Sequence, residues 1–319
     1  MSDRIHDRLA GRTVAVRDTL HDVPPHAVYE ITVDGRRAVY KESVAPRGSA
    51  GVEGRVHRFV SAETSIPVPE VLAVGEDWFV TAYREDAPVE PDDERRLEAS
   101  WLRVAGATLA RLHEEATVER PGLLAVDGDP GDEASELVVD SEAGAGWSDA
   151  LDDQLSVYER VLGGTGYADA ITGARRFLAT HAERFDVLDD GEASLCHGWF
   201  TPEHVAVDEG EPVCVIDFEH AVAGSPEWDY WRTAIPLFVG PAWDGPADAE
   251  ERFREAYESV RPLPEGFDER ADAYQAFVAA SHLDSLATQR GIDDDTRELA
   301  AFLTERIAEH LEGCRAAWD

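Results

Sequence analysis

Residues 194–219 read SLCHGWFTPEHVAVDEGEPVCVIDFE. Two short runs of β-branched residues, 205–207 and 213–216, predict a β-hairpin in this segment. A loop that contains His197 precedes the hairpin, and Asp217 follows it directly. An unpaired carboxylate at the end of an apolar strand is costly, so we expect Asp217 to bind a metal or to accept hydrogen bonds.

Helical patterns surround this hairpin on both sides. One long amphipathic helix is predicted by apolar residues that recur every three to four positions, Leu97, Trp101, Ala105, Leu109 and Leu112. Further helices are predicted at 147–162, 167–185, 227–238, 246–260, 268–289 and 293–313. The last of these carries a predicted apolar stripe of Leu299, Phe302, Leu303, Ile307 and Leu311. Residues 118–145 are rich in Gly, Asp, Glu and Ser and are predicted to form a solvated loop.

The first ninety residues have a different, strand-rich pattern. Strands are predicted at 13–16, 28–33, 38–41, 70–74 and 78–83, with Asp34-Gly35 as a hairpin turn. A single helix is predicted at 49–62, with one apolar face made of Val52, Val56, Phe59 and Val60. The chain is therefore expected to have an α+β fold with two lobes, a β-rich lobe at 1–88 and a mainly helical lobe at 89–319.

Composition excludes several functional classes. The chain has 319 residues, 66 acidic against 29 basic, and a formal net charge of −37. Such a field repels phosphate and anionic lipid, so neither a nucleic acid nor a membrane is expected as a partner. No apolar run approaches the ~18 residues of a spanning helix, and the charged N-terminus does not resemble a signal peptide, which indicates a soluble, cytoplasmic protein.

The basic residues are 28 Arg and one Lys, and this single lysine is Lys41. An acidic, lysine-poor surface is typical of a chain that works in molar salt, so a halophilic source is our hypothesis, although codon bias also favours Arg. The three cysteines, Cys196, Cys214 and Cys314, have no CxxC spacing and no zinc-ligand pattern. We therefore assign neither a disulfide nor a catalytic thiol.

Four features now stand in a fixed order along the chain: Lys41 on a strand, Glu53 on the next helix, the His197 loop, and Asp217 after the hairpin. With this order, the sequence resembles the aminoglycoside phosphotransferase and choline kinase family, small-molecule relatives of protein kinases. Three further segments carry the resemblance: IPVPEV at 66–71, LARLH at 109–113 and DFEHAVAGSPEWD at 217–229. The resemblance covers nearly the whole chain.

The resemblance implies a two-lobed protein kinase-like fold and an ATP- and Mg²⁺-dependent phosphotransferase that acts on a hydroxyl of a small molecule. By position, Lys41 and Glu53 would hold the nucleotide phosphates, and backbone groups of Ala82 and Tyr83 would meet the adenine. Asp217 and His204 would bind the metal. His197 is expected to brace the loop, and Asp229 to hydrogen-bond it.

The sequence departs from the family at the positions that carry the reaction. The family's loop has a catalytic Asp where this chain has Trp199, and a metal-binding Asn where it has His204. Glu203 and Asp208 are the nearest carboxylates, but their spacing does not match that of the family's base. The loop that would cover the nucleotide, 21–26, has no glycine, and Pro24 and Pro25 remove amide donors.

Alternatives remain open for several of these residues. Trp199 could fill the acceptor pocket, stack on a ligand or pack in the core, and His204 could be a ligand or a strand-entry residue. Asp272 and Asp284 could attract a cationic acceptor, but a solvated acidic face is the expected interpretation in so acidic a chain.

Two functions from different classes follow. The first is the small-molecule phosphotransferase, with activity in doubt because Trp199 and His204 replace reacting groups. The second is a catalytically inactive pseudokinase that binds a nucleotide or a protein partner. The sequence does not identify an acceptor.

Overall fold

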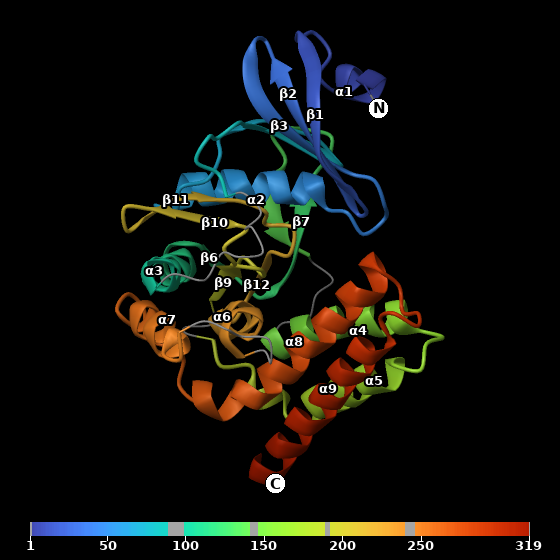
Figure 1. Ribbon diagram of the computed structural model, residues 1–319, viewed down its shortest axis with the longest axis vertical. Helices are drawn as coiled ribbons and strands as arrows, with labels where there is room; N and C mark the ends of the chain where they lie inside the picture. The colour runs from blue at the N-terminus through green and yellow to red at the C-terminus, as the bar shows by residue number, and fades with distance from the viewer. Residues whose placement is uncertain (1, 89–98, 141–145, 189–191, 240–245, 319) are drawn as a thin grey trace.

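We describe the protein from a computed structural model, which places residues 2–88, 99–140, 146–188, 192–239 and 246–318. A β-rich lobe with its sheet at one end and a helical lobe at the other form the kinase-like fold, which confirms the predicted fold class (Figure 1). The predicted division at 88/89 lies where the described residues stop, and it stays a prediction.

The first lobe is a five-stranded antiparallel sheet in the order β1-β2-β3-β5-β4. Its strands are β1 Val14–Val23, β2 His26–Val33, β3 Arg36–Ser43, β4 Val71–Val74 and β5 Trp78–Ala82. Asp34 and Gly35 form the predicted turn, both with positive φ (52° and 83°), as a two-residue hairpin requires. Register is thereby fixed between β2 and β3, from Val33 opposite Arg36 to His26 opposite Ser43.

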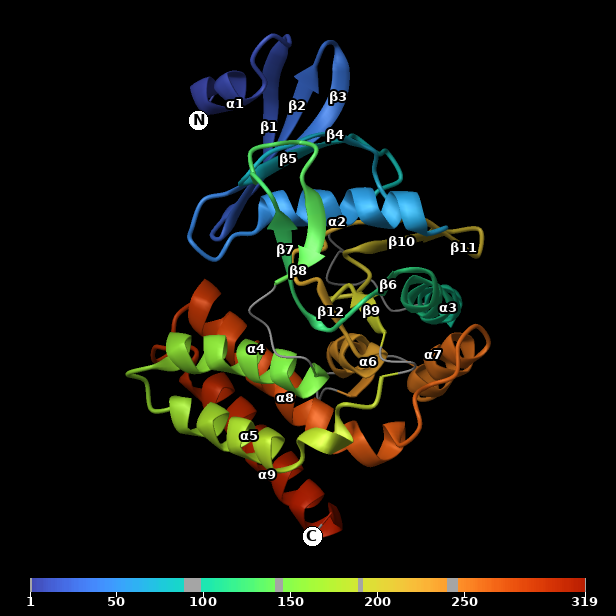
Figure 2. The same ribbon diagram turned by 180° about the vertical axis from the view of Figure 1, so that it is seen from behind.

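Two helices cover the two faces of this sheet. Helix α1, Ser2–Arg8, packs Ile5 against the face that contains Tyr29, Ile31 and Tyr40. Helix α2, Ala50–Glu63, lies between the sheet and the rest of the protein in both views (Figures 1 and 2). Because side chains alternate along β3, Lys41 points away from the Tyr40 face and toward α2.

The second lobe is built around a core of helices. These are α3 Ala99–Glu115, α4 Trp147–Leu162, α5 Ala168–Thr180, α6 Pro226–Ala234, α7 Ala249–Glu258, α8 Phe267–Gln289 and α9 Arg297–Trp318. A 3₁₀ turn, Ala182–Arg184, follows α5, and a π-helical segment, Ile235–Val239, follows α6. Leu97, which we expected to begin α3, lies outside the described residues. None of the described helices combines the length and the apolar character needed to cross a membrane.

The predicted hairpin is present as β10 Val205–Asp208 and β11 Glu211–Val215. The solvated loop predicted at 118–145 is wrong, because this segment contains β7 Gly122–Asp127 and β8 Glu136–Val139. They belong to a second five-stranded sheet, completed by β6 Thr117–Val118, β9 Ala193–Cys196 and β12 Val222–Gly224. β7 pairs with β8 across a polar connection at 128–135, and on its other edge Leu123 pairs with Val222, about a hundred residues away, so local composition conceals both strands.

The predicted stripe of α9 is only partly correct. Leu303, Ile307 and Leu311 are buried in the main core. Leu299 and Phe302 are instead 44% and 41% exposed. They lie at the start of the helix, where Ala300 occupies the buried position, so the apolar face there is one residue out of register with our prediction.

Candidate functional site: an ion cluster between the lobes

Lys41 lies at the centre of three carboxylates from two segments, α2 and the residues that follow β11. Its Nζ is 2.8 Å from Glu53 Oε2 on α2, 2.8 Å from Asp217 Oδ1 and 3.0 Å from Glu219 Oε2. We refer to Lys41, Glu53, Asp217 and Glu219 as the Lys41 cluster. Lys41 is 6% exposed and Glu53 only 2%. The structure therefore brings together three residues expected from the sequence and adds Glu219.

Burial and charge act against each other in this cluster. Burial raises the pKa of Glu53 to about 8, although the Lys41 ammonium opposes the shift. Burial also acts to raise the pKa of Asp217, but the charge of Lys41 outweighs it and lowers the value to about 2. The pKa of Lys41 lies well above its usual range because the charges of Asp217, Glu53 and Glu219 outweigh its burial. Asp217 and Lys41 are thus both charged at neutral pH.

At neutral pH one ammonium faces two ionised carboxylates, Asp217 and Glu219, so the cluster has excess negative charge. Asp217 and Glu219 offer oxygen ligands, which Mg²⁺ prefers, and their outer oxygens are partly accessible (side chains 28% and 21% exposed). The donor set therefore fits a divalent cation held by these two carboxylates. Lys41 lies beside them, with its ammonium in contact with all three carboxylates.

His204 lies close to this set but offers a different kind of ligand. Its Nδ1 donates to the Trp199 carbonyl at 2.9 Å, because a carbonyl only accepts. Its Nε2 then faces Asp217 Oδ2 at 3.4 Å. The two atoms form an ion pair if the ring is protonated, or two neighbouring ligands of one cation if it is neutral. Imidazole is a poorer ligand for Mg²⁺ than the amide oxygen that the family has at this position.

The β1–β2 turn lies over the cluster. His26, the first residue of β2, places Nδ1 2.8 Å from Glu219 Oε2, and its Nε2 accepts the Ser49 N–H at 3.3 Å. The Pro25 carbonyl accepts the Val44 N–H at 2.8 Å. The turn expected at 21–26 to cover a nucleotide is therefore bound to the β3–α2 loop and to Glu219.

Ala82 and Tyr83 lie at the end of β5, where we expected backbone contacts to adenine. The Ala82 N–H donates to the Glu70 carbonyl at 2.8 Å, and the Tyr83 N–H donates to the Arg37 carbonyl at 3.2 Å. Both donors are therefore engaged within the N-terminal lobe. The Tyr83 ring packs against the Arg37 guanidinium, 3.7 Å from the ring centroid.

Hydrogen bonds to α6 hold the loop after β9 in place. The Asp229 carboxylate on α6 accepts the N–H of His197 at 2.5 Å and that of Gly198 at 2.8 Å, as expected from the sequence. Gly198 has φ +84°, and a Cβ there would lie 2.3 Å from the His220 carbonyl, so the turn requires glycine. His197 is fully buried, and its Nε2 donates to the Ile216 carbonyl at 2.9 Å. It braces the loop against the strand that leads to Asp217.

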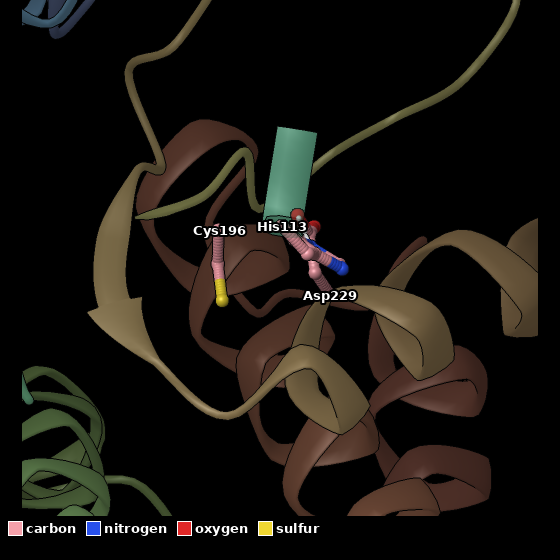
Figure 3. Close-up of side chains that lie close together, drawn as sticks. All are labelled: His113, Cys196 and Asp229. Atoms are coloured by element: carbon pink, nitrogen blue, oxygen red, sulfur yellow. Dashed lines mark hydrogen bonds and ion pairs between the residues drawn. The ribbon is translucent and has the colours of Figure 1, made fainter. Parts of the chain in front are cut away.

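Figure 3 shows His113 against Asp229, with Cys196 beside them. The three could supply metal ligands by distance. However, His113 already contacts Asp229 through Nε2 (3.1 Å) and the Tyr257 hydroxyl through Nδ1 (2.8 Å). Burial raises the pKa of the Cys196 thiol well above its usual range. A protonated thiol and an imidazole with both nitrogens engaged make this a structural hydrogen-bond network.

Trp199 is half-buried and does not belong to the core. Its ring lies 5.4 Å from the His282 ring and 5.6 Å from the Arg232 guanidinium. Asp208 is exposed at the tip of the β10–β11 hairpin, and among the described residues Glu203 makes no hydrogen bond or ion pair with the Lys41 cluster. Neither Glu203 nor Asp208 therefore takes the place of the catalytic Asp that Trp199 replaces.

The structure also corrects the interpretation of Asp284. It is 5% exposed, and its two oxygens lie 3.1 and 2.8 Å from the Arg47 guanidinium of the β3–α2 loop. This contact joins the β3–α2 loop to α8 of the second lobe. Asp272 does keep a largely exposed side chain (53%) and contacts His310. A buried acid and a solvated acid look alike in so acidic a sequence, and only the partner distinguishes them.

His57 provides a pH-dependent link to the cluster, and we predict a measurable consequence. Burial and the charge of Lys41 lower the pKa of His57 to about 3, and its ring packs against Phe79 and Phe218. The unfolded chain protonates this residue near pH 6.5. The stability that the neutral ring contributes is thus complete above pH 6.5 and is lost as the pH falls toward 3.

We expect His57→Phe to reduce acid sensitivity. Between pH 6.5 and 4.5, its free energy of unfolding should gain on that of the wild type by up to about 1.4 kcal/mol per pH unit. Urea unfolding at pH 7.5, 6.5, 5.5 and 4.5 measures this difference. Parallel curves for the two proteins would show that His57 is not held neutral in the folded state.

The sequence matches the phosphotransferase enzyme family model over residues 25–269. The kinase-like fold, with a lysine–carboxylate cluster between its lobes, agrees with this match. The match covers more than half of the chain. The chain therefore belongs to the phosphotransferase enzyme family. A search of curated proteins gives no match.

Solved structures share the fold at low sequence identity. Aminoglycoside phosphotransferase APH(4)-Ia is 17% identical, with a TM-score of 0.64 over 98% of this chain and 97% of that one. Its ternary complex with ADP and hygromycin B is similar at 16%, TM-score 0.62, and 97% of each chain. The macrolide 2′-phosphotransferase MphH from Brachybacterium faecium is 16% identical, with a TM-score of 0.57 over 95% of this chain and 97% of that one.

Proposed function

We propose that the chain is a pseudokinase, a phosphotransferase-family protein that binds a magnesium nucleotide between its lobes without transferring its terminal phosphoryl group at an enzymatic rate. The observation that carries this proposal is Trp199. An indole that contacts His282 and Arg232 stands at the family's base position, and an indole cannot accept a proton from an acceptor hydroxyl.

The size of the missing contribution supports this proposal. A positioned general base contributes ~10²–10⁴ in rate, roughly 3–5 kcal/mol of the barrier. Phosphoryl transfer depends mainly on positioning and metal charge, so this loss alone leaves slow turnover. Pro24 and Pro25 carry no N–H donor, and the N–H groups of Ala82 and Tyr83 are already engaged. Fewer groups therefore remain to position the nucleotide for transfer.

The retained groups support binding of the metal and the phosphates. When bound, Mg²⁺ would neutralise phosphate charge. Asp217 and Glu219 would hold it, and Lys41 would direct its ammonium group at the phosphates while Glu53 keeps Lys41 in place. Such binding would tie the lobes together more firmly, which is how a chain without turnover can act as a regulatory module for a protein partner.

A second candidate is a slow ATP- and Mg²⁺-dependent phosphotransferase that acts on a hydroxyl of a small molecule. The specific observation in its favour is the complete Lys41 cluster, with the chain's only lysine at its centre. In this case the acceptor hydroxyl would lose its proton to water or to the phosphate itself. Turnover with an acceptor distinguishes this candidate from the pseudokinase.

The experiment is a thermal unfolding series with MgATP, in low salt and in molar KCl, on the wild type and on Asp217→Ala. A ligand that binds only the folded state raises the melting temperature, by an amount that corresponds to about 2.7 kcal/mol at 100 times Kd. We expect MgATP to raise the melting temperature of the wild type but not of the variant, with no accompanying ADP release. No shift in the wild type at saturating MgATP would contradict nucleotide binding, and rapid ADP release would contradict the pseudokinase. The salt series also tests the halophilic hypothesis.

A further inference from the structure

Three of the described arginines are buried almost completely: Arg55, Arg232 and Arg270, which are 3%, 4% and 6% exposed. A guanidinium carries five N–H donors and a permanent charge, so each buried arginine needs acceptors or an anion. Arg55 donates to five backbone carbonyls at 2.7–3.1 Å. Arg270 forms an ion pair with the buried Glu227. Arg55 and Arg270 therefore both have acceptors within the protein.

Arg232 differs from these two. Its Nε donates to the Gly198 carbonyl at 2.5 Å. Within the described parts of the chain, it forms no ion pair with a carboxylate. Two indole rings flank it instead, with its guanidinium carbon 5.6 Å from the centroid of Trp199 and 5.2 Å from that of Trp228. Aromatic faces stabilise a cation but leave its four Nη hydrogens without a charged acceptor.

The other groups around Arg232 are also unable to balance its charge. The Tyr158 hydroxyl, which accepts a hydrogen bond from Arg232, is neutral, because burial, opposed by Arg232, raises the Tyr158 pKa. His282 is held neutral, since burial and the charges of Arg232 and His220 lower its pKa to about 3. The nearby Asp284 carboxylate, which also influences Tyr158, is already bound by Arg47. None of these groups therefore supplies Arg232 with a charged partner of its own.

An orphaned polar atom marks the same place. His282 Nε2 is buried and has no hydrogen-bond partner among the described residues, while its ring stacks edge-on against Trp199. Arg232 and His282 lie close to the surface, because Trp199 is half-buried and the His220 side chain is exposed (38%). In a chain with 66 acidic residues, a buried arginine without a carboxylate does not reflect a shortage of acids.

We infer that Arg232, Trp199 and His282 form a binding site for an oxyanion, a carboxylate or a phosphate group, carried by a small flat molecule. The planar guanidinium matches two oxygens of such a group, His282 Nε2 supplies a further hydrogen bond, and Trp199 offers a stacking face. The site goes beyond the proposed function, because it stands whether or not the chain transfers phosphate.

The test compares three probes of the same shape and different charge: benzoate, benzamide and benzamidine. Ligand-detected NMR titrations at one ionic strength give a Kd for each with the full chain. We expect benzoate to bind about 10–100-fold more tightly than benzamide, because hydrogen bonds to a charged group have that strength, and benzamidine to bind least. The net charge of −37 repels anions in general, so this order can arise only from a local site. Inorganic phosphate, as a competitor, distinguishes the two kinds of oxyanion.

Two substitutions at the half-buried Trp199 give matched controls. Trp199→Asp places a carboxylate beside Arg232 and should abolish the preference for benzoate, whereas Trp199→Phe keeps an aromatic face and should retain it. Arg232→Gln should also abolish the preference, and thermal unfolding shows whether that variant is folded. Equal binding of benzoate and benzamide by the wild type would overturn the inference, as would a preference for benzoate that persists in Trp199→Asp.

Discussion

Trp199→Asp combined with His204→Asn is expected to raise ATP turnover by about 10²–10⁴-fold over the wild type. The first change supplies a carboxylate at the position of the missing base, and the second supplies an amide oxygen beside Asp217. Both side chains are accessible enough to accept the change, since Trp199 is half-buried and His204 is 17% exposed. The bonds of Asp229 to the loop involve main-chain N–H groups and should survive.

The measurement is ADP release with excess MgATP, with water as the acceptor. Asp217→Ala in the same double variant is the matched control and should remove the gain, because it deletes a carboxylate that the metal needs. A double variant that binds MgATP but hydrolyses it no faster than the wild type would contradict the proposal that these two groups alone disable the reaction. The β1–β2 turn, with His26 on Glu219, would then be the next element to change.

Strands with a local turn signal could be predicted from the sequence, and strands with a distant partner could not. The β2–β3 hairpin follows from alternation and from Asp34-Gly35, which adopt positive φ values. Strand β7 forms a hairpin with β8, with Leu124 opposite Val139, but their connection at 128–135 is eight residues long and carries no two-residue turn signal, and its other neighbour, β12, is about a hundred residues away. The buried Arg55 holds the following loop on α2 through carbonyls such as those of Pro130 and Ser135. These interactions depend on the tertiary fold.

The residues of the candidate site that could be predicted are those whose order and spacing along the chain indicate their position. Glu53 lies three and seven residues before Val56 and Val60, so it shares their buried face and reaches Lys41. Glu219 follows Asp217 by two residues, and that spacing was a usable signal which we did not apply. His26 had no sequence signal, because its contact with Glu219 depends on how the first hairpin packs against the second lobe.

The same limit applies to charge. Arg232 and Arg270 are both helical arginines, and nothing in their immediate sequence shows that Glu227 pairs with one while the other is left with two indoles. Net charge describes the surface, where most of the 66 acids are found, but it does not describe the interior. In the interior, the Lys41 cluster has more negative than positive charge, whereas Arg232 has no ion pair with a carboxylate among the described residues. This difference suits the first for a cation and the second for an anion.

Lys41→Met should destabilise the fold by about 3–5 kcal/mol at pH 9.5, above the pKa of Glu53, because it leaves the buried carboxylate of Glu53 without its cation. Burial already raises the pKa of Glu53 to about 8 while Lys41 opposes it, so removing Lys41 raises this pKa further. A protonated Glu53 no longer needs a counter-charge. The loss should therefore shrink as the pH falls from 9.5 to 7 and change little below that, as measured by urea unfolding of the variant and the wild type at each pH.

The double variant Lys41→Met/Glu53→Gln distinguishes a lost charge pair from lost packing. It removes both charges while keeping the length of the Glu53 side chain, so it should be more stable at pH 9.5 than Lys41→Met alone, and its deficit should vary less with pH. If the two single losses simply add in the double variant, Glu53 does not depend on Lys41 for its burial. The cluster would then be held together by Asp217 and Glu219, which approach Lys41 from the other lobe.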